Sequence, residues 1–181
     1  HSFPDVTFDV RVADHERATE ALVSYEVDIV LVFQPAPLAE FRQLAAFDQH
    51  LVALIPPDHP LAGQKTLRLR DCAQHPVALS DRSTGGRQII ERFSERSGVA
   101  FDIALESNSF ELLRQASARA GLISFQIAVG APSKDFPGLV VRPIDRRDAP
   151  AGPLVLGQLR GRTLPVACAA FVGQLKERMK V

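Results

Sequence analysis

The chain has 181 residues, 46% of them apolar and 23% charged, with 21 Lys and Arg residues balanced by 21 Asp and Glu residues. This composition is typical of a soluble globular protein with a sizeable core, and the balanced charge gives no basic surface for nucleic acid. The apolar runs are far shorter than the roughly 20 residues that cross a bilayer, and the N-terminal residues do not resemble a secretory signal. We therefore expect a cytoplasmic protein that makes no use of a membrane.

The reactive side chains form no recognisable catalytic or metal-binding arrangement. Cys72 and Cys168 lie far apart without a His or Cys at metal-ligand spacing, so we expect buried thiols and no metal site. The five histidines are scattered, and His59 and His75 both precede proline, which is typical of turns. The segment 83–86 lacks the lysine and the glycine spacing of a nucleotide-binding loop. The sequence thus predicts neither an enzyme nor a bound cofactor.

The first elements follow a strand, helix, strand order. Apolar residues alternate with polar ones from Val6 to Val12, which predicts a strand with one face on the core. Asp14 is a suitable N-cap for an amphipathic helix over residues 15–25. The segment 29–33 is apolar on both faces, as in a central parallel strand, so we interpret these elements as a βαβ unit.

An uninterrupted apolar run, Leu51 to Ile55, is followed by Pro56 and Pro57. Because proline has no backbone N–H, we predict that a buried strand ends at Ile55 and leaves through a stiff turn. We expect the chain to pass here from one half of the fold to the other.

The rest of the chain repeats the alternation of strands and helices. Helices are predicted to begin at Ser83 and at Asn108, which would form a capping box with Glu111, and to end at Gly98 and Gly121. A closing helix follows residue 165, and further strands are predicted at 77–79, 101–105, 122–129, 139–141 and 154–156. This order favours an α/β protein with mainly parallel sheets and two lobes.

Candidate ligand-binding residues follow the predicted strands, because ligands of open α/β sheets bind beyond the carboxyl ends of the strands. At a helix start, unpaired N–H groups and hydroxyl side chains attract anions or polar groups. The alternatives remain open: the hydroxyls could only cap helices, His15 could be a solvated first-turn residue and Phe33 a core aromatic. The candidates are His15, Phe33, Ser83, Thr84, Gly85, Ser107, Asn108 and Ser109.

The order of several short motifs resembles the effector-binding domain of LysR-type transcriptional regulators. The motifs are Phe3-Pro4-Asp5-Val6, Thr19-Glu20-Ala21-Leu22, Val27-Asp28-Ile29-Val30, Asp58-His59-Pro60-Leu61-Ala62, Ile123-Ser124-Phe125, Gly138-Leu139-Val140 and Gly161-Arg162-Thr163-Leu164-Pro165. Tyr25 departs from the family pattern, which usually has glycine there, and Gly121 stands alone where two glycines are common.

The resemblance implies a type 2 periplasmic-binding-protein-like fold, with two Rossmann-like lobes joined by two crossover strands. Leu51–Ile55 and Leu154–Gly157 would be the crossovers, lobe I would comprise residues 1–53 and 154–181, and lobe II residues 54–153. A small metabolite, anionic or aromatic, would bind in the cleft between the lobes and contact the candidate residues.

The resemblance also implies a transcription regulator that acts as a dimer or tetramer. Such a regulator binds DNA only through an N-terminal helix-turn-helix, which this sequence does not contain, and the first strand and helix of the regulatory domain are also missing from it. The alternative that we keep is a fragment of a solute-binding protein of a transport system, which shares the fold.

Overall fold

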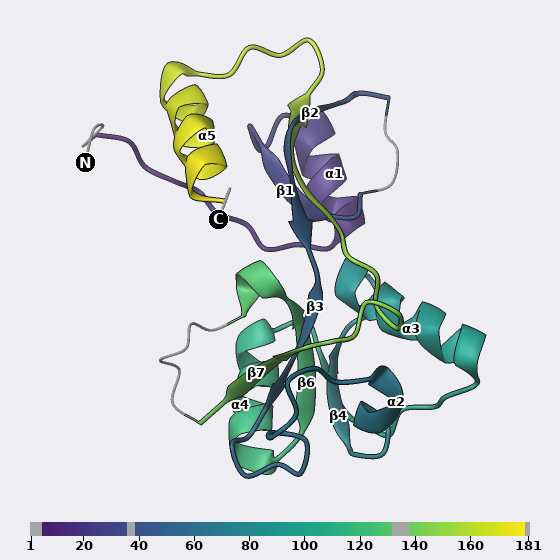
Figure 1. The fold of residues 1–181 in the computed structure, drawn as a ribbon. Helices are drawn as coiled ribbons and strands as arrows, with labels where there is room; N and C mark the ends of the chain where they lie inside the picture. The colour runs from purple at the N-terminus through teal and green to yellow at the C-terminus, as the bar shows by residue number, and fades with distance from the viewer. Residues whose placement is uncertain (1–4, 36–38, 132–137, 180–181) are drawn as a thin grey trace. The chain divides into compact units, whose positions relative to one another are not determined.

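The computed structural model describes residues 5–35, 39–131 and 138–179. The chain divides into two compact units, His1–Phe47 with Pro153–Val181, and Asp48–Gly152 (Figure 1). The helices are α1 (His15–Val23), α2 (Leu69–Cys72), α3 (Gly85–Ser97), α4 (Phe110–Ala120), the short 3₁₀ helix η1 (Ala128–Gly130) and α5 (Val166–Arg178). The strands are β1 (Val30–Phe33), β2 (Phe41–Gln49), β3 (Leu51–Ile55), β4 (Val77–Ser80), β5 (Ile103–Ser107), β6 (Ile123–Ile127), β7 (Val140–Pro143) and β8 (Gly152–Leu159). None of the described helices is long and apolar enough to cross a membrane.

The first unit is built on a three-stranded sheet with the order β1-β8-β2. One apolar cluster joins Leu22 of α1 to Val30 and Leu159 of the sheet, and a second joins Val172 of α5 to Phe47 and Leu156. Burial of these side chains holds each helix on the sheet, because removing apolar area from water contributes about 25 cal/mol per Å².

The second unit is built on a five-stranded sheet with the order β5-β4-β6-β3-β7. β4 runs parallel to β5 and β6, whereas β3 is antiparallel to β6 and β7. Helix α4 covers one face, where Ser117 donates a hydrogen bond of 2.7 Å to Ser124 of β6. On β3, Val52 faces the cluster that includes Ala118 of α4, whereas Leu51 faces Gly86 of α3. Because neighbouring residues of a strand point to opposite faces, α3 and α4 lie on opposite faces of this sheet.

Both sheets and the helices around them confirm the predicted α/β class. The chain passes between the two units at Phe47–Asp48, inside β2, and at Gly152–Pro153, inside β8. The segment Leu51–Ile55, expected as a crossover, is a strand with the predicted bounds and lies within the second unit. Its five residues are all buried between β6 and β7, which explains why it is apolar on both faces.

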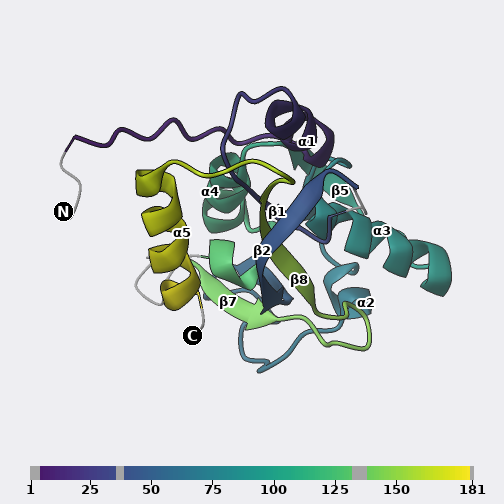
Figure 2. The ribbon, with the colours of Figure 1, turned by 90° about the horizontal axis from the view of Figure 1, so that it is seen from above.

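The predicted strand from Val6 to Val12 is not formed. Figures 1 and 2 draw this described segment as a coil that leads into α1, and Phe8, Val10 and Val12 are 63%, 80% and 86% exposed. Alternation indicates an extended backbone, but a strand also needs a neighbour for its N–H and C=O groups, and the three-stranded sheet does not include this segment. The βαβ interpretation fails with it.

The predicted pairing of the strand at 29–33 is also wrong. β1 pairs only with β8 within the three-stranded sheet, and the pairing is antiparallel, with Val30 opposite Gly157 and Phe33 opposite Leu154. It is an edge strand, and Leu31 is 45% exposed. In the second sheet parallel and antiparallel pairs are mixed, so the expectation of mainly parallel sheets holds only for β4 with its two neighbours.

Three turn residues explain where helices end. Gly98 and Gly121 have φ of 68° and 72°, the left-handed conformation predicted for both. Tyr25 has φ of 62°, so its position favours glycine, and the tyrosine is held by the guanidinium of Arg162, which lies 5.4 Å from the ring centroid. Arg162 also donates to Asp28 at 2.7 Å. These contacts stabilise a turn whose backbone conformation is unfavourable for tyrosine.

Candidate functional site

Two candidate segments meet at one edge of the sheet in the second unit. β4 and β5 are parallel neighbours, and their last residues, Ser80 and Ser107, lie opposite each other in the register. The loop 81–84 and the segment 107–109 therefore leave the sheet side by side. Each leads into a helix, α3 or α4, so two helix N-termini, the ends that attract anions, lie at this edge.

The loop after β4 is held by hydrogen bonds among its own polar groups. Asp81 accepts the backbone N–H of Ser83 at 2.9 Å and also its hydroxyl. Thr84 is the N-cap of α3, and its Oγ1 accepts the N–H of Arg87 at 3.3 Å. The hydroxyls of Thr84 and Ser80 share a hydrogen bond of 2.7 Å. Thr84 therefore caps α3, and capping does not prevent its hydroxyl from contacting a ligand as well.

A buried arginine connects the strand end before this loop to the neighbouring strand. Arg87 of α3 is 2% exposed, and its Nη1 donates to the carbonyl of Ser80 at 2.9 Å and to the carboxylate of Glu106 at 2.8 Å. Its Nε donates to Glu91 at 3.2 Å. One guanidinium thus links the carboxyl ends of β4 and β5, which fixes the spacing between the two candidate segments.

In the second segment, the helix cap differs from the predicted one. Ser109, rather than Asn108, is the N-cap of α4, and its Oγ accepts the N–H of Leu112 at 3.2 Å. The N–H of Ser109 donates to the hydroxyl of Ser107 at 3.0 Å, and this local turn moves the helix start one residue onward. The capping box from Asn108 to Glu111 is consequently not formed, and Glu111 instead accepts from Gln115 at 3.0 Å.

The other two candidates belong to the first unit. His15 is the first residue of α1, whose N-cap Asp14 accepts the N–H of Arg17 at 2.8 Å. Phe33 is the last residue of β1 and is half-buried. The next residue, Gln34, has a positive φ of 48° and donates its N–H to Pro153 at 2.8 Å. His15 and Phe33 thus lie at a helix start and a strand end, as predicted.

Several polar groups at the second sheet were not singled out from the sequence. Gln126 of β6 is 4% exposed, and its Nε2 has no hydrogen-bond partner among the described residues. The buried Nε of Arg114 on α4 also has no hydrogen-bond partner among them. Gln126 points to the α4 face, since it follows Ser124 by two positions. A polar residue inside the apolar run 122–129 was the only signal for it. Arg87 carried no signal, because an arginine in a helix is usually exposed.

The thiols are not activated. Burial raises the pKa of Cys72 to about 12, and burial also raises the pKa of Cys168, so neither is a ready thiolate at neutral pH. Within residues 5–35, 39–131 and 138–179, no group of three or more His, Cys, Asp or Glu side chains is placed to hold a metal ion.

The fold of this chain is similar to that of several solved regulatory domains. The regulatory domain of CcmR from Synechocystis PCC6803, in complex with 2-PG, has a TM-score of 0.82 at 23% identity, covering 99% of this chain and 86% of that one. The effector-binding domain of QuiR, in complex with shikimate, has a TM-score of 0.74 at 19% identity, covering 94% of this chain and 80% of that one. At such identities the likeness shows the fold, which is that of type 2 periplasmic-binding-protein-like effector-binding domains.

The family follows from the sequence match. The family model described as the LysR substrate binding domain matches residues 1–180, and the chain belongs to this family. It is 33% identical over 111 residues to the RuBisCO operon transcriptional regulator of Allochromatium vinosum, a match that covers 61% of this chain and 36% of the relative. It is 27% identical over 186 residues to the HTH-type transcriptional regulator CbbR of Cereibacter sphaeroides, covering 92% of this chain and 60% of the relative.

The chain thus spans about a third to three fifths of these curated relatives. They are transcriptional regulators rather than enzymes, and the chain corresponds to the effector-binding domain of a LysR-type regulator. None of these matches favours a solute-binding protein of a transport system, the alternative kept from the sequence.

Proposed function

We propose that this chain senses a small metabolite on behalf of a LysR-type transcription regulator. The observation that carries the proposal is the family match over residues 1–180. It is supported by the two helix N-termini, with their serine and threonine residues, at the carboxyl edge of β4 and β5. Binding would regulate transcription by favouring one conformation of the domain over another.

The proposed ligand contacts are the eight residues at strand ends and helix starts. They are His15, Phe33, Ser83, Thr84, Gly85, Ser107, Asn108 and Ser109. The two units, residues 1–47 with 153–181 and residues 48–152, would be lobe I and lobe II of this effector-binding domain. An anionic group suits the helix N-termini, and an aromatic group suits Phe33.

The whole regulator would work as a cytoplasmic homo-oligomer, a dimer or tetramer, and would contact DNA through a helix-turn-helix outside these 181 residues. It would carry out no catalysis. Membership of the family and the regulator relatives support these proposals.

Substitutions of Thr84 test the site. Thr84→Ser keeps a cap and a hydroxyl, whereas Thr84→Val loses both, at a cost of about 1 kcal/mol in the free energy of unfolding because α3 loses its N-cap. For any metabolite that raises the melting temperature of the wild-type chain, we expect Thr84→Val to increase the Kd about tenfold and Thr84→Ser to change it little. An unchanged Kd for a folded Thr84→Val protein would remove this residue from the site.

A further inference from the structure

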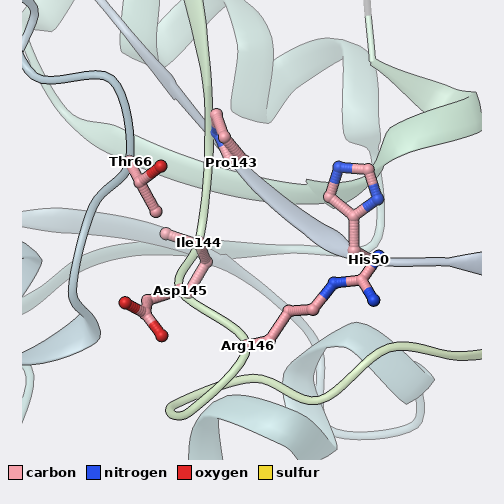
Figure 3. Close-up of a pocket in the computed structure, with 6 residues that line it drawn as sticks. All are labelled: His50, Thr66, Pro143, Ile144, Asp145 and Arg146. Atoms are coloured by element: carbon pink, nitrogen blue, oxygen red, sulfur yellow. The ribbon is translucent and has the colours of Figure 1, made fainter.

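The second unit contains a pocket that none of the proposed ligand contacts lines. It has a volume of about 440 Å³, and its walls are His50, Thr66, Pro143, Ile144, Asp145 and Arg146 (Figure 3). Small-molecule sites in proteins commonly have volumes of about 300–1,000 Å³, so this pocket is large enough for a metabolite.

Three separate segments build the pocket. The N–H of Ile144 donates to Leu51 at 3.0 Å, which joins the end of β7 to the start of β3. Leu67 forms an isolated parallel bridge with Ile144 and accepts the N–H of Asp145 at 2.8 Å, which brings in the loop that contains Thr66. Ile144 is 2% exposed and belongs to the core, so the pocket rests on a firmly packed base.

The charges in the pocket are not balanced. Asp145 accepts hydrogen bonds from Arg147, from the backbone N–H at 2.9 Å and from the guanidinium at 3.0 and 2.7 Å. These hydrogen bonds lower the pKa of Asp145 below its usual range, so it is ionised and neutralised by Arg147. The side chains of Arg146 and His50 form no hydrogen bond or ion pair with the described residues.

Figure 3 draws the imidazole of His50 and the guanidinium of Arg146 on one side of the pocket, with Thr66 and Asp145 on the other. A positive charge that no acidic side chain neutralises, beside a ring N–H and opposite a hydroxyl, attracts an oxyanion. The planar fork of arginine matches the geometry of carboxylate and phosphate groups.

We propose that this pocket binds a small oxyanion-bearing molecule, whose carboxylate or phosphate accepts hydrogen bonds from Arg146 and His50. Thr66 donates a third hydrogen bond, and Pro143 contacts the apolar part of the ligand.

The pocket is separate from the strand-end segments. In the sheet order β5-β4-β6-β3-β7, those segments follow β5 and β4, whereas the pocket lies at β3 and β7. With β6 between them and neighbouring strands about 4.8 Å apart, β3 is about 10 Å from β4. Binding at this pocket therefore does not depend on the proposed sensing function.

A titration with inorganic phosphate tests the proposal. Backbone amide resonances of the full 181-residue chain are followed by NMR at constant ionic strength, with chloride exchanged for phosphate. We expect saturable shifts at His50, Thr66 and Arg146. Arg146→Gln removes the positive charge and His50→Leu removes the ring N–H, so each should increase the Kd about tenfold or more. Arg70→Gln, at an exposed arginine of α2 outside the pocket, should leave the Kd unchanged.

Shifts that do not saturate would overturn the proposal, as would equal weakening by Arg70→Gln and Arg146→Gln. Saturable shifts confined to 83–85 and 107–109 would also overturn it, while supporting an anion site at the helix starts. Because Arg146 is exposed and the His50 side chain has no hydrogen bond within the described chain, both variants should keep the wild-type unfolding curve.

Discussion

The missing side chain at Gly157 allows β8 and β2 to pack closely. A Cβ at this position would overlap the ring of Phe41 on β2. Gly157→Ala therefore forces the ring or the strand to move, and we expect it to lower the free energy of unfolding by about 1–3 kcal/mol, as other overpacked cores do. Urea denaturation measures this change.

Gly173 provides the matched control. It lies inside α5, and a Cβ there would meet nothing within 4 Å. Gly173→Ala should raise the free energy of unfolding by about 0.5–1 kcal/mol, since glycine is unfavourable in a helix interior. If both substitutions destabilise the protein equally, close packing at Gly157 is not the cause.

At the scale of the elements, an ion pair joins α2 to the segment after β7. Asp148 is 2% exposed and accepts from Arg68 at 2.8 and 2.6 Å and from the N–H of Leu69 at 2.8 Å. Burial alone would raise the pKa of Asp148, but the hydrogen bonds from Arg68 and Leu69 outweigh it and hold the pKa below the usual value. The carboxylate thus stabilises the fold above the unfolded pKa of about 3.9, and this stabilisation is lost as the pH falls through the folded pKa.

Removing this charge should be costly. Asp148→Asn leaves Arg68 without its partner, and we expect a loss of about 3 kcal/mol or more in the free energy of unfolding at pH 7. Asp145→Asn, three residues earlier, breaks a pair whose Arg147 side chain is 74% exposed, and should destabilise the fold much less than Asp148→Asn does. Similar losses for the two variants would show that Asp148 contributes no more than a surface charge.

Two histidines connect the turn after β3 to the start of β4. The rings of His59 and His75 lie 4.6 Å apart between centroids, and Nδ1 of His59 accepts the N–H of Leu61 at 3.1 Å. Burial, and then the proximity of His75, lower the pKa of His59. Because the folded pKa is depressed, neutral His59 stabilises the fold above about pH 6.5, and this contribution is lost as the pH falls through the folded pKa.

This sign gives a testable pH dependence. Between pH 7.5 and 5.5, the free energy of unfolding should fall more for the wild-type chain than for His59→Asn, which keeps an acceptor near Nδ1 but does not titrate. Chemical denaturation at each pH measures both slopes, and equal slopes would rule out His59 as the titrating group.

Across the whole molecule, features that depend on neighbouring residues in the sequence could be predicted, whereas the pairing of strands could not. The strand Leu51–Ile55 and the helix ends at Gly98 and Gly121 depend on nearby residues, and all three were predicted. The segment 6–12 and the pairing of β1 depend on which strand lies alongside, and periodicity does not specify a neighbour.

In the candidate site, too, local features were predicted and contacts between distant residues were not. The positions at helix starts followed from the order of elements, and Thr84 was identified as a capping or ligand residue. The link from Arg87 to Ser80 and Glu106 joins residues of three elements and could not be predicted. The helix start at Ser109 depended on a single hydrogen bond from its own N–H to Ser107.

Thermal unfolding with a metabolite panel tests most directly whether this chain binds a small metabolite. The panel should contain phosphorylated, carboxylated and aromatic compounds. A ligand at about 100 times its Kd stabilises the native state by about 2.7 kcal/mol, which corresponds to about 5–11 °C for a domain of this size. We predict a saturable increase of this order in the melting temperature for at least one compound. A melting temperature that no compound changes would contradict metabolite binding by this chain.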